Sequence, residues 1–408
     1  MTTIDRTLRF GVNYVPSSKW WYCWVDWDAA SIADDLHAIA SLGMDHLRVM
    51  CLWPIFQPNA GYVSHTALDR LQQLLDLADS ARLDVEVTVL NGWLSGFAFH
   101  PAWRGDRNIF TDPHMIDAEE FLLRTIARRV AGHPRFLGFD LGNELSVLQS
   151  YGNRIPSLAE GDAWHRRMMD LCEELAPGKL HVNGVDHQQW FMDTGFSREC
   201  LATAGPITSL HTYIEFTGAR SLYRPMEHGC LHLAEYCIEL AKAYSPDPAR
   251  PIWLQEFGAS SQWMPAEVIP DFAEQTIRNA ASCAGLWGFT WWCSHDLNTG
   301  FTGFNPLEYD LGLLDQHNRL KPIGRRISQL ASEFRSNPPP VADRPVALVQ
   351  PDDIFSRPQP GKPAGWQFAG PYMDMIAQGI RPAVVLASRA ADNAHLASRG
   401  IRELRLLQ

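Results

Sequence analysis

The sequence lacks the features that mark exported and membrane-bound proteins. No uninterrupted apolar run reaches the roughly 18 residues that a membrane-spanning helix needs. The first residues, "MTTIDRTLRFGVNY", contain no basic region followed by an apolar stretch, so they do not resemble a signal peptide. These two absences predict a soluble protein of the cytoplasm that has no membrane partner.

Positive charge is also scarce. The 408 residues contain 35 Lys and Arg against 46 Asp and Glu, which gives a formal net charge of −11. Because nucleic-acid binding requires a basic surface, this balance argues against DNA or RNA as a partner. A neutral small molecule suits the composition better.

Motifs for disulfides and cofactors are missing as well. Eight cysteines are present, but none forms a Cys-x-x-Cys pair. A chain of this length does not need disulfides to fold, so we expect free thiols in a reducing compartment. No Gly-x-Gly-x-x-Gly follows the first apolar run, which argues against a dinucleotide-binding sheet, and we expect no cofactor.

What the sequence does contain is a repeated alternation of short β-rich runs and longer runs of helical period. Eight strands with about eight helices over roughly 325 residues favour an α/β fold, the (β/α)8 TIM barrel, over an open doubly wound sheet. The predicted strands are Phe10–Tyr14, Asp45–Cys51, Asp84–Leu90, Phe136–Gly142, Leu180–Val185, Ile207–His211, Ile252–Gln255 and Leu286–Trp291.

The C-terminal residues follow a proline-rich connector, "SNPPPVADRP". Beyond it, "PAVVLAS" and "IRELRLL" predict two strands joined by a helix over Arg389–Ala397. We therefore expect a barrel over residues 1–336 and, over residues 337–408, the connector and a small α/β appendage packed on the barrel. Contact between subunits is the alternative role for this appendage, and the oligomeric state stays open.

A glutamate follows each of two predicted strands. "GFDLGNE" ends in Asn143-Glu144, and "PIWLQEFG" places Glu256 at the end of its strand. The carboxyl ends of barrel strands meet at one mouth, where such side chains face a ligand. Two carboxylates across that mouth are the minimum for cleaving a glycosidic bond, because one donates a proton while the other attacks or activates water. Adjacent residues of a flat strand point to opposite sides, so Asn143 and Glu144 require a bend or bulge.

These two motifs resemble those of clan A retaining glycoside hydrolases, most closely glycoside hydrolase family 5. In that family the acid/base glutamate follows an asparagine at the end of strand four, and the nucleophile ends strand seven. Asn143, Glu144 and Glu256 match this arrangement. The resemblance spans about residues 10–335 and implies retention of the anomeric configuration.

Four further positions match the family. Arg48 in "HLRVM" corresponds to the arginine near the nucleophile, and His211 and Tyr213 in "LHTY" to the His-x-Tyr of strand six. Trp292 in "WGFTWW" corresponds to the aromatic floor under the reacting sugar. We expect Arg48 and Tyr213 to lower the pKa of Glu256 and to keep it ionised.

The remaining roles follow from the same chemistry. Asn143 can donate a hydrogen bond to the sugar 2-hydroxyl, an interaction that strengthens as the transition state forms. Ionised Glu256 in turn raises the pKa of Glu144, which therefore acts first as an acid and later as a base.

The expected substrate is a short oligosaccharide. Long predicted loops around the mouth favour a closed pocket and removal of a terminal sugar. "GVNYVPSSKWWYCW" is similar to an intracellular family 5 subgroup that acts on the mannosyl-β-1,4-N-acetylglucosamine core of N-glycans, so a β-mannoside is preferred over a β-glucoside or another β-glycoside.

Aromatic rings that would stack on sugars are those of Trp20, Trp21, Trp24, Trp93, Trp190 and Trp263. The polar candidates are Asn91, Asp186 and His187; the last two would touch a sugar hydroxyl or only satisfy one another.

Two other classes compete with this interpretation. His181, Asp186, His187 and His211 would serve a metal-dependent barrel hydrolase, but "FGVNYV" lacks a His-x-His pair and no compact ligand spacing occurs, so we expect no metal. A barrel that binds sugar without cleaving it is disfavoured, because binding alone does not require two opposed carboxylates.

Overall fold

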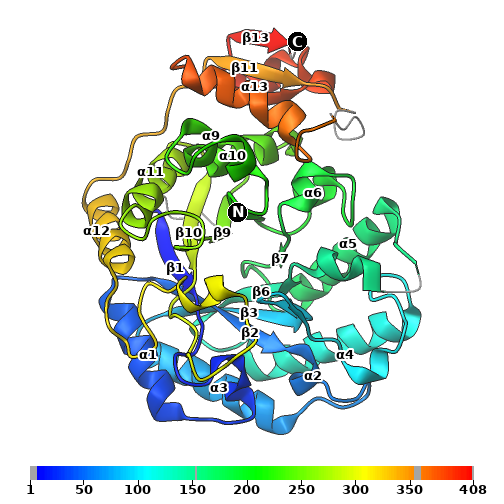
Figure 1. The fold of residues 1–408 in the computed structure, drawn as a ribbon. Helices are drawn as coiled ribbons and strands as arrows, with labels where there is room; N and C mark the ends of the chain where they lie inside the picture. The colour runs from blue at the N-terminus through cyan, green and yellow to red at the C-terminus, as the bar shows by residue number, and fades with distance from the viewer. Residues whose placement is uncertain (1–6, 152–153, 353–359, 407–408) are drawn as a thin grey trace.

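The computed structural model describes residues 7–151, 154–352 and 360–406. Eight parallel strands form one sheet in the order β7-β6-β3-β2-β1-β10-β9-β8, which curls into a barrel (Figure 1). The hydroxyl of Ser209 on β8 donates a hydrogen bond to the carbonyl of Asn183 on β7 at 2.7 Å and so joins the two ends of the sheet. The strands are β1 (Arg9–Asn13), β2 (His46–Leu52), β3 (Asp84–Asn91), β6 (Phe136–Asn143), β7 (Val182–Gly184), β8 (Thr208–Thr212), β9 (Ile252–Phe257) and β10 (Leu286–Trp292). The predicted (β/α)8 barrel is confirmed, and every predicted strand overlaps an observed one.

Helices surround the barrel (Figure 1), and most of the long ones bury one apolar stripe against it, whereas α10 (Leu233–Tyr244) is buried along its whole length. Helix α4 shows why they begin where they do: Asp112 accepts hydrogen bonds from the free amides of His114 and Met115, and Pro113 occupies the first turn. The long helices are α1 (Ala29–Ser41), α3 (His65–Ser80), α4 (Pro113–Val130), α5 (Leu158–Leu175), α10 (Leu233–Tyr244), α11 (Ile269–Ala281) and α12 (Pro322–Ser336). Short helices in the connecting loops are α2 (Trp53–Phe56), α6 (Gln188–Phe191), α7 (Arg198–Leu201), α8 (Ala219–Leu222) and α9 (His228–Leu231). Among the described residues no helix is both long and apolar enough to cross a membrane.

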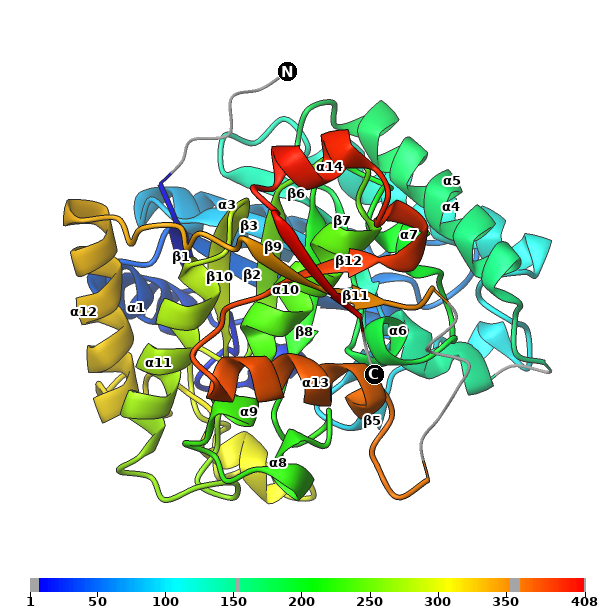
Figure 2. The ribbon, with the colours of Figure 1, turned by 90° about the horizontal axis from the view of Figure 1, so that it is seen from above.

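A second, smaller sheet follows the barrel. It is parallel with the order β12-β11-β13, formed by β11 (Val346–Gln350), β12 (Ala383–Leu386) and β13 (Glu403–Leu406), with helices α13 (Trp366–Ala377) and α14 (Asn393–Ser398). Strands β12 and β13 lie where "PAVVLAS" and "IRELRLL" predict strands, whereas β11 and α13 were not predicted. Figure 2 shows this unit lying across α9 and α10.

Buried ion pairs hold the small unit on the barrel. Arg344 pairs with Glu235 of α10 at 2.6 Å, and Arg399 pairs with Glu239 of the same helix at 2.8 Å. At the other end of the contact, the indole nitrogen of Trp366 donates to the carbonyl of Thr217, in the loop after β8, at 2.7 Å. The small unit therefore supports a loop that comes from the mouth of the barrel.

Candidate active site

The carboxyl ends of the strands surround a cavity of about 420 Å³. Glu144, directly after β6, and Glu256, on β9, both line it. The other predicted site residues that line it are Asn143, Asp186, His187, Tyr213, Trp93, Trp263 and Trp292. Parallel strands deliver all these side chains to one end of the barrel, which is the end where barrel enzymes bind their ligands.

The backbone bends sharply where Asn143 meets Glu144. Glu144 has a φ of +47°, in the left-handed region that residues with a side chain rarely adopt. The β6–β7 pairing shifts register between Asp140 and Asn143, and the amide of Glu144 donates to the carbonyl of Gly184 at 2.7 Å. This bend lets two adjacent side chains face the same cavity, as the sequence requires. Strain of this kind is held in place at functional sites.

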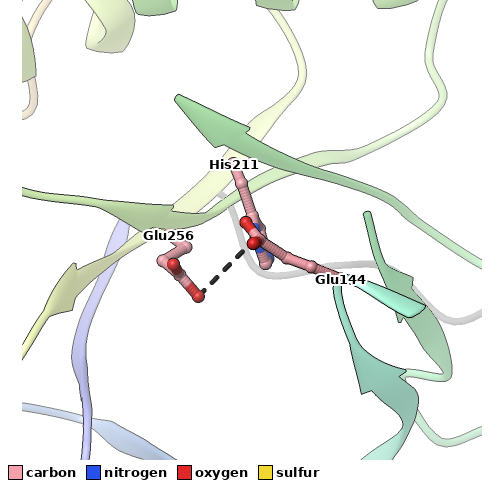
Figure 3. A group of neighbouring side chains, drawn as sticks. All are labelled: Glu144, His211 and Glu256. Atoms are coloured by element: carbon pink, nitrogen blue, oxygen red, sulfur yellow. Dashed lines mark hydrogen bonds and ion pairs between the residues drawn. The ribbon is translucent and has the colours of Figure 1, made fainter. Parts of the chain in front are cut away.

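The two carboxylates come close together around one imidazole (Figure 3). One oxygen of Glu144, one oxygen of Glu256 and a ring nitrogen of His211 all lie within 4.8 Å of one another. Carboxyl groups about 5–5.5 Å apart are typical of retaining glycosidases, whereas inverting enzymes hold theirs about 6.5–9.5 Å apart to admit a water molecule. The spacing therefore suits direct attack of one carboxylate on a sugar.

Glu256 is held by two strong donors. Arg48 donates to Oε2 at 2.8 Å, the hydroxyl of Tyr213 donates to Oε1 at 2.8 Å, and His211 lies 3.6 Å from Oε2. Burial raises the pKa of Glu256, and nearby Glu144 adds to the rise, while His211, Arg48 and Tyr213 act against it. Arg48 and Tyr213 thus lower the pKa of Glu256 as expected, but the loss of hydration outweighs them and the net shift is upward.

Glu144 has fewer donors. Burial raises its pKa to about 7, and Arg48 opposes that rise. Its only side-chain partner within the described residues is His211, whose Nδ1 lies 2.9 Å from Oε1. A carboxyl group with a pKa near neutrality can both give and take a proton under ordinary conditions.

The neighbours of His211 determine which of its nitrogens carries the proton. Both oxygens of Glu86 accept from Nε2 of Gln255 at 3.0 Å, so the amide oxygen of Gln255 faces Nε2 of His211 at 3.2 Å and accepts from it. Burial lowers the pKa of His211, which favours the neutral ring. A neutral ring that donates from Nε2 accepts at Nδ1. In the short contact between the two side chains, the protonated carboxyl of Glu144 therefore donates to Nδ1 of His211.

Arg48 lies beneath the cavity in a network that sequence reasoning did not foresee. Nε and Nη2 donate to Oδ2 of Asp140 at 2.9 and 2.6 Å, and Nη1 also donates to Asn13 at 3.0 Å. Gly184 makes room for the guanidinium, since a Cβ there would lie 2.5 Å from Nη2. The available signal was a charge inside an apolar strand: Asp140 in "GFDLG" and Glu86 in "DVEVTV" each require a buried partner.

Asn143 is oriented by the loop after β3. Its amide nitrogen donates to the carbonyl of Trp93 at 3.0 Å, which leaves one N–H for a ligand. The indole of Trp93 lines the cavity itself. The backbone of one aromatic residue thus fixes the amide, while its ring forms the wall.

Aromatic rings form another part of the wall. The ring of Trp263 meets those of Tyr213 and Phe216 edge-on, with centroids 6.0 and 5.7 Å apart. Phe216 was not predicted, although it is 53% exposed and lines the cavity. Exposed aromatic faces at a cavity mouth are suited to the apolar faces of sugar rings.

Five predicted ligand contacts lie elsewhere. Trp20, Trp21 and Trp24 form a 3-10 helix, η1 (Trp20–Trp24), that turns their indoles into the core, and Nε1 of Trp24 donates to the carbonyl of Met50 at 2.8 Å. Trp190 and Asn91 are also fully buried and, like these three, do not line the cavity. The prediction that these five contact a sugar is corrected, and for the four tryptophans the reason is that large indoles gain more free energy in the core than at a rim.

Asp186 and His187 do not bond to each other within the described contacts. The hydroxyl of Ser146 donates to Asp186 at 3.2 Å, and His187 bonds to the backbone of Phe216. Burial raises the pKa of Asp186 well above its ordinary value, and the charge of Glu144 adds to this rise. Burial lowers the pKa of His187 to about 4. Both groups therefore face the cavity in forms that can bind hydroxyls.

The four residues proposed for a metal do not converge. His181 lies at the opposite end of the barrel, where its ring bonds to the carbonyl of Ala176 and to the amide of Phe139. Glu144, His211 and Glu256 are close enough to share a cation. However, a cation there would lie next to the guanidinium of Arg48, which already neutralises Glu256.

Comparisons with known proteins agree with this geometry. The family model described as Cellulase (glycosyl hydrolase family 5) matches residues 9–294. A comparison with curated proteins found no match. Among solved structures, a GH5_18 variant from Streptomyces cattleya in complex with Manb1-4GlcNAc is 39% identical, with a TM-score of 0.93 over 98% of this chain and 99% of that one.

Two further structures are similar. A GH5_18 variant from Bifidobacterium longum subsp. longum ATCC 55813, also in complex with Manb1-4GlcNAc, is 34% identical, with a TM-score of 0.89 over 98% of this chain and 96% of that one. The exo-beta-1,4-mannosidase Op5Man5 from Opitutaceae bacterium strain TAV5 is 26% identical, with a TM-score of 0.79 over 94% and 72%. The chain therefore belongs to glycosyl hydrolase family 5 and is a glycoside hydrolase.

Proposed function

We propose that this enzyme removes β-mannose from mannosyl-β-1,4-N-acetylglucosamine with retention of configuration. The observation that carries the proposal is the approach of Glu144 and Glu256 to within 4.8 Å across one cavity. The choice of sugar is supported by the two GH5_18 structures that hold Manb1-4GlcNAc, and the exo-acting mode by the exo-beta-1,4-mannosidase.

In the first step Glu256 attacks the anomeric carbon. Its carboxylate forms a bond to that carbon, the bond to the glycosidic oxygen breaks, and Glu144 transfers its proton to the departing N-acetylglucosamine. In the second step Glu144, now ionised, takes a proton from water, and the resulting hydroxide displaces Glu256. Two inversions at one carbon give overall retention.

The surrounding residues serve these steps. Arg48 and Tyr213 orient Glu256 for attack and stabilise it as the leaving group of the second step. His211 accepts from Glu144 in the resting enzyme and keeps its proton in place. Asn143 donates to the 2-hydroxyl, and Trp292, in the cavity wall, stacks under the sugar.

The same proposal places the enzyme in the cytoplasm. All eight cysteines are free and buried, which suits a reducing compartment. A cytoplasmic enzyme meets disaccharides that have entered the cell, and a cavity of about 420 Å³ suits a ligand of that size.

Hydrolysis of a panel of substrates tests this proposal. The panel consists of aryl β-mannoside, β-glucoside and β-galactoside together with mannosyl-β-1,4-N-acetylglucosamine, and NMR follows the first product anomer. We expect the mannosyl substrates to be cleaved fastest, with β-mannose appearing first. A preference for glucosides would move the assignment to a β-glucosidase, and sugar binding without any turnover would make the protein a non-catalytic sugar-binding barrel.

A further inference from the structure

A third carboxyl group lies in the cavity beside the catalytic pair. Glu308 belongs to a 3-10 helix, η4 (Pro306–Tyr309), in the long loop after β10, and its side chain lines the same cavity as Glu144 and Glu256. It is 9% exposed. No cation pairs with Glu308 within the described part of the chain, although buried carboxylates are rare without one.

One oxygen of Glu308 is already occupied and the other is not. Oε2 accepts a hydrogen bond from the hydroxyl of Ser95 at 3.1 Å. Oε1 has no hydrogen-bond partner in residues 7–151, 154–352 or 360–406. The backbone is fixed from both sides, since the amide of Glu308 donates to the carbonyl of Asn305 and its carbonyl accepts from Leu297. A rigid, largely buried acceptor is thus left for a ligand.

Ser95 comes from a different loop of the barrel mouth. It lies at the turn between β4 (Trp93–Leu94) and β5 (Phe97–Ala98), a hairpin in the loop after β3, and has a φ of +51°. Beside the hydrogen bond to Glu308, the ring of Phe97 packs edge-on against that of Phe304, with centroids 5.0 Å apart. The loops after β3 and β10 therefore meet and close one side of the cavity.

We propose that Glu308, oriented by Ser95, binds the hydroxyls of the terminal mannose that lie farthest from the bond being cleaved. The proposal rests on the function proposed above. Glu144, Glu256 and Asn143 are committed to carbons 1 and 2 of the sugar, so a carboxyl group from another wall meets the hydroxyls at positions 3, 4 or 6. A sugar chain extended at those positions would run into the bridge between the two loops.

Either protonation state of Glu308 supports this contact. Burial raises its pKa to about 7, Ser95 opposes the rise, and the charge of Glu256 adds to it. The carboxylate accepts from a hydroxyl, and the carboxylic acid can accept and donate. A site built to bond a substrate hydroxyl strongly rejects an analogue that lacks it, because the buried group is then left unpaired.

The test compares variants with substrates that lack single hydroxyls. kcat/KM is measured for wild type, Glu308→Ala and Glu308→Gln on mannosyl-β-1,4-N-acetylglucosamine and on its 3-, 4- and 6-deoxymannosyl analogues. We expect Glu308→Ala to lose about 10- to 100-fold on the parent disaccharide, the range for a hydrogen bond to a charged group. On at least one analogue the same variant should fall within about threefold of wild type, because the partner hydroxyl is gone. Glu308→Gln keeps an acceptor and should lose less.

Matched controls separate binding from folding. Glu215→Ala removes an exposed glutamate from the loop after β8 that does not line the cavity, and should leave every rate unchanged. If Glu308→Ala only loosened its loop, it would lose the same factor on all four substrates, which would overturn the proposal, as would an unchanged rate on the parent. A wild type that cleaves none of the mannosides would instead refute the proposed function.

Discussion

Glu144 and Glu256 are the same amino acid at the same end of the barrel, yet their surroundings differ. Glu256 accepts from a guanidinium and a phenol, and Arg48 behind it is itself fixed by Asp140. In the part of the chain that the structure describes, the side chain of Glu144 has one hydrogen-bond partner, the acceptor nitrogen of His211. Burial raises the pKa of both, so the difference lies in the donors. Donors stabilise the ionised form, and their number therefore separates the nucleophile from the acid.

The largest effect should come from removing each carboxylate in turn. Glu256→Ala is expected to lose about 10⁶-fold in kcat on any leaving group, the scale for the loss of a covalent nucleophile. Glu144→Ala should lose about 10²–10⁴-fold on the disaccharide. It should lose far less in the first step on a dinitrophenyl mannoside, whose leaving group needs no proton. Steady-state and burst kinetics measure these losses. Equal losses on both leaving groups in Glu144→Ala would contradict the assignment of Glu144 as the proton donor.

Arg48 should be nearly as important for the fold as for the reaction. Arg48→Met leaves Asp140 and Glu256 buried without a cation, which is expected to cost about 3–5 kcal/mol in the free energy of unfolding. Urea denaturation measures this value. Arg154→Met, at an exposed ion pair with Glu160, is the matched control and should leave the unfolding midpoint unchanged. Similar midpoints for the two variants would contradict the assigned role of Arg48.

Tyr213→Phe removes one of the two donors to Glu256 and keeps the ring in the wall. The expected loss is about 10- to 100-fold in kcat/KM, since the lost bond is to a charged group. The pKa of the acidic limb should also rise, because a donor to the ionised form is gone. A pH profile of kcat/KM measures both changes, and an unmoved acidic limb would show that Tyr213 acts only through packing.

The basic limb of the pH profile of kcat/KM reports on the protonation of Glu144. Since this acid must be protonated and its pKa is about 7, kcat/KM should fall as the pH rises through about 7. Gln255→Leu frees His211 to donate from Nδ1, which stabilises ionised Glu144 and lowers its pKa. The basic limb should then move about one unit to lower pH, corresponding to about 1.4 kcal/mol. A shift to higher pH would contradict the assigned tautomer.

The smallest effect on activity is expected for Trp24. Trp24→Phe loses the bond to Met50 and some packing, about 1–3 kcal/mol of stability, but should leave KM unchanged because the ring is in the core. Trp263→Phe, in the cavity wall, should raise KM. Thermal denaturation and KM values distinguish the two variants. A raised KM in Trp24→Phe would show that this ring contributes to sugar binding.

The two glutamates also show which parts of the fold and the site can be predicted from the sequence alone. Apolar runs place the eight strands, and a carboxylate at the end of a strand has few structural uses, so Glu144 and Glu256 were predictable. Whether a loop tryptophan faces inward or outward depends on the turn it forms, so the 3-10 helix that buries Trp20, Trp21 and Trp24 was not foreseen. Glu308 lies in a long loop without periodicity, and its place in the cavity depends on tertiary contacts such as those with Leu297 and Ser95.

Covalent labelling of the nucleophile tests whether Glu256 attacks the sugar while Glu144 supplies the proton. A 2-deoxy-2-fluoromannosyl fluoride forms the glycosyl-enzyme quickly and releases it slowly, so peptide mass spectrometry can locate the modified residue. We expect one sugar per chain, attached to the peptide that contains Glu256, and undiminished labelling in Glu144→Ala because fluoride leaves without a proton. Attachment to Glu144, or inactivation without a covalent sugar, would contradict the roles assigned to the two carboxylates.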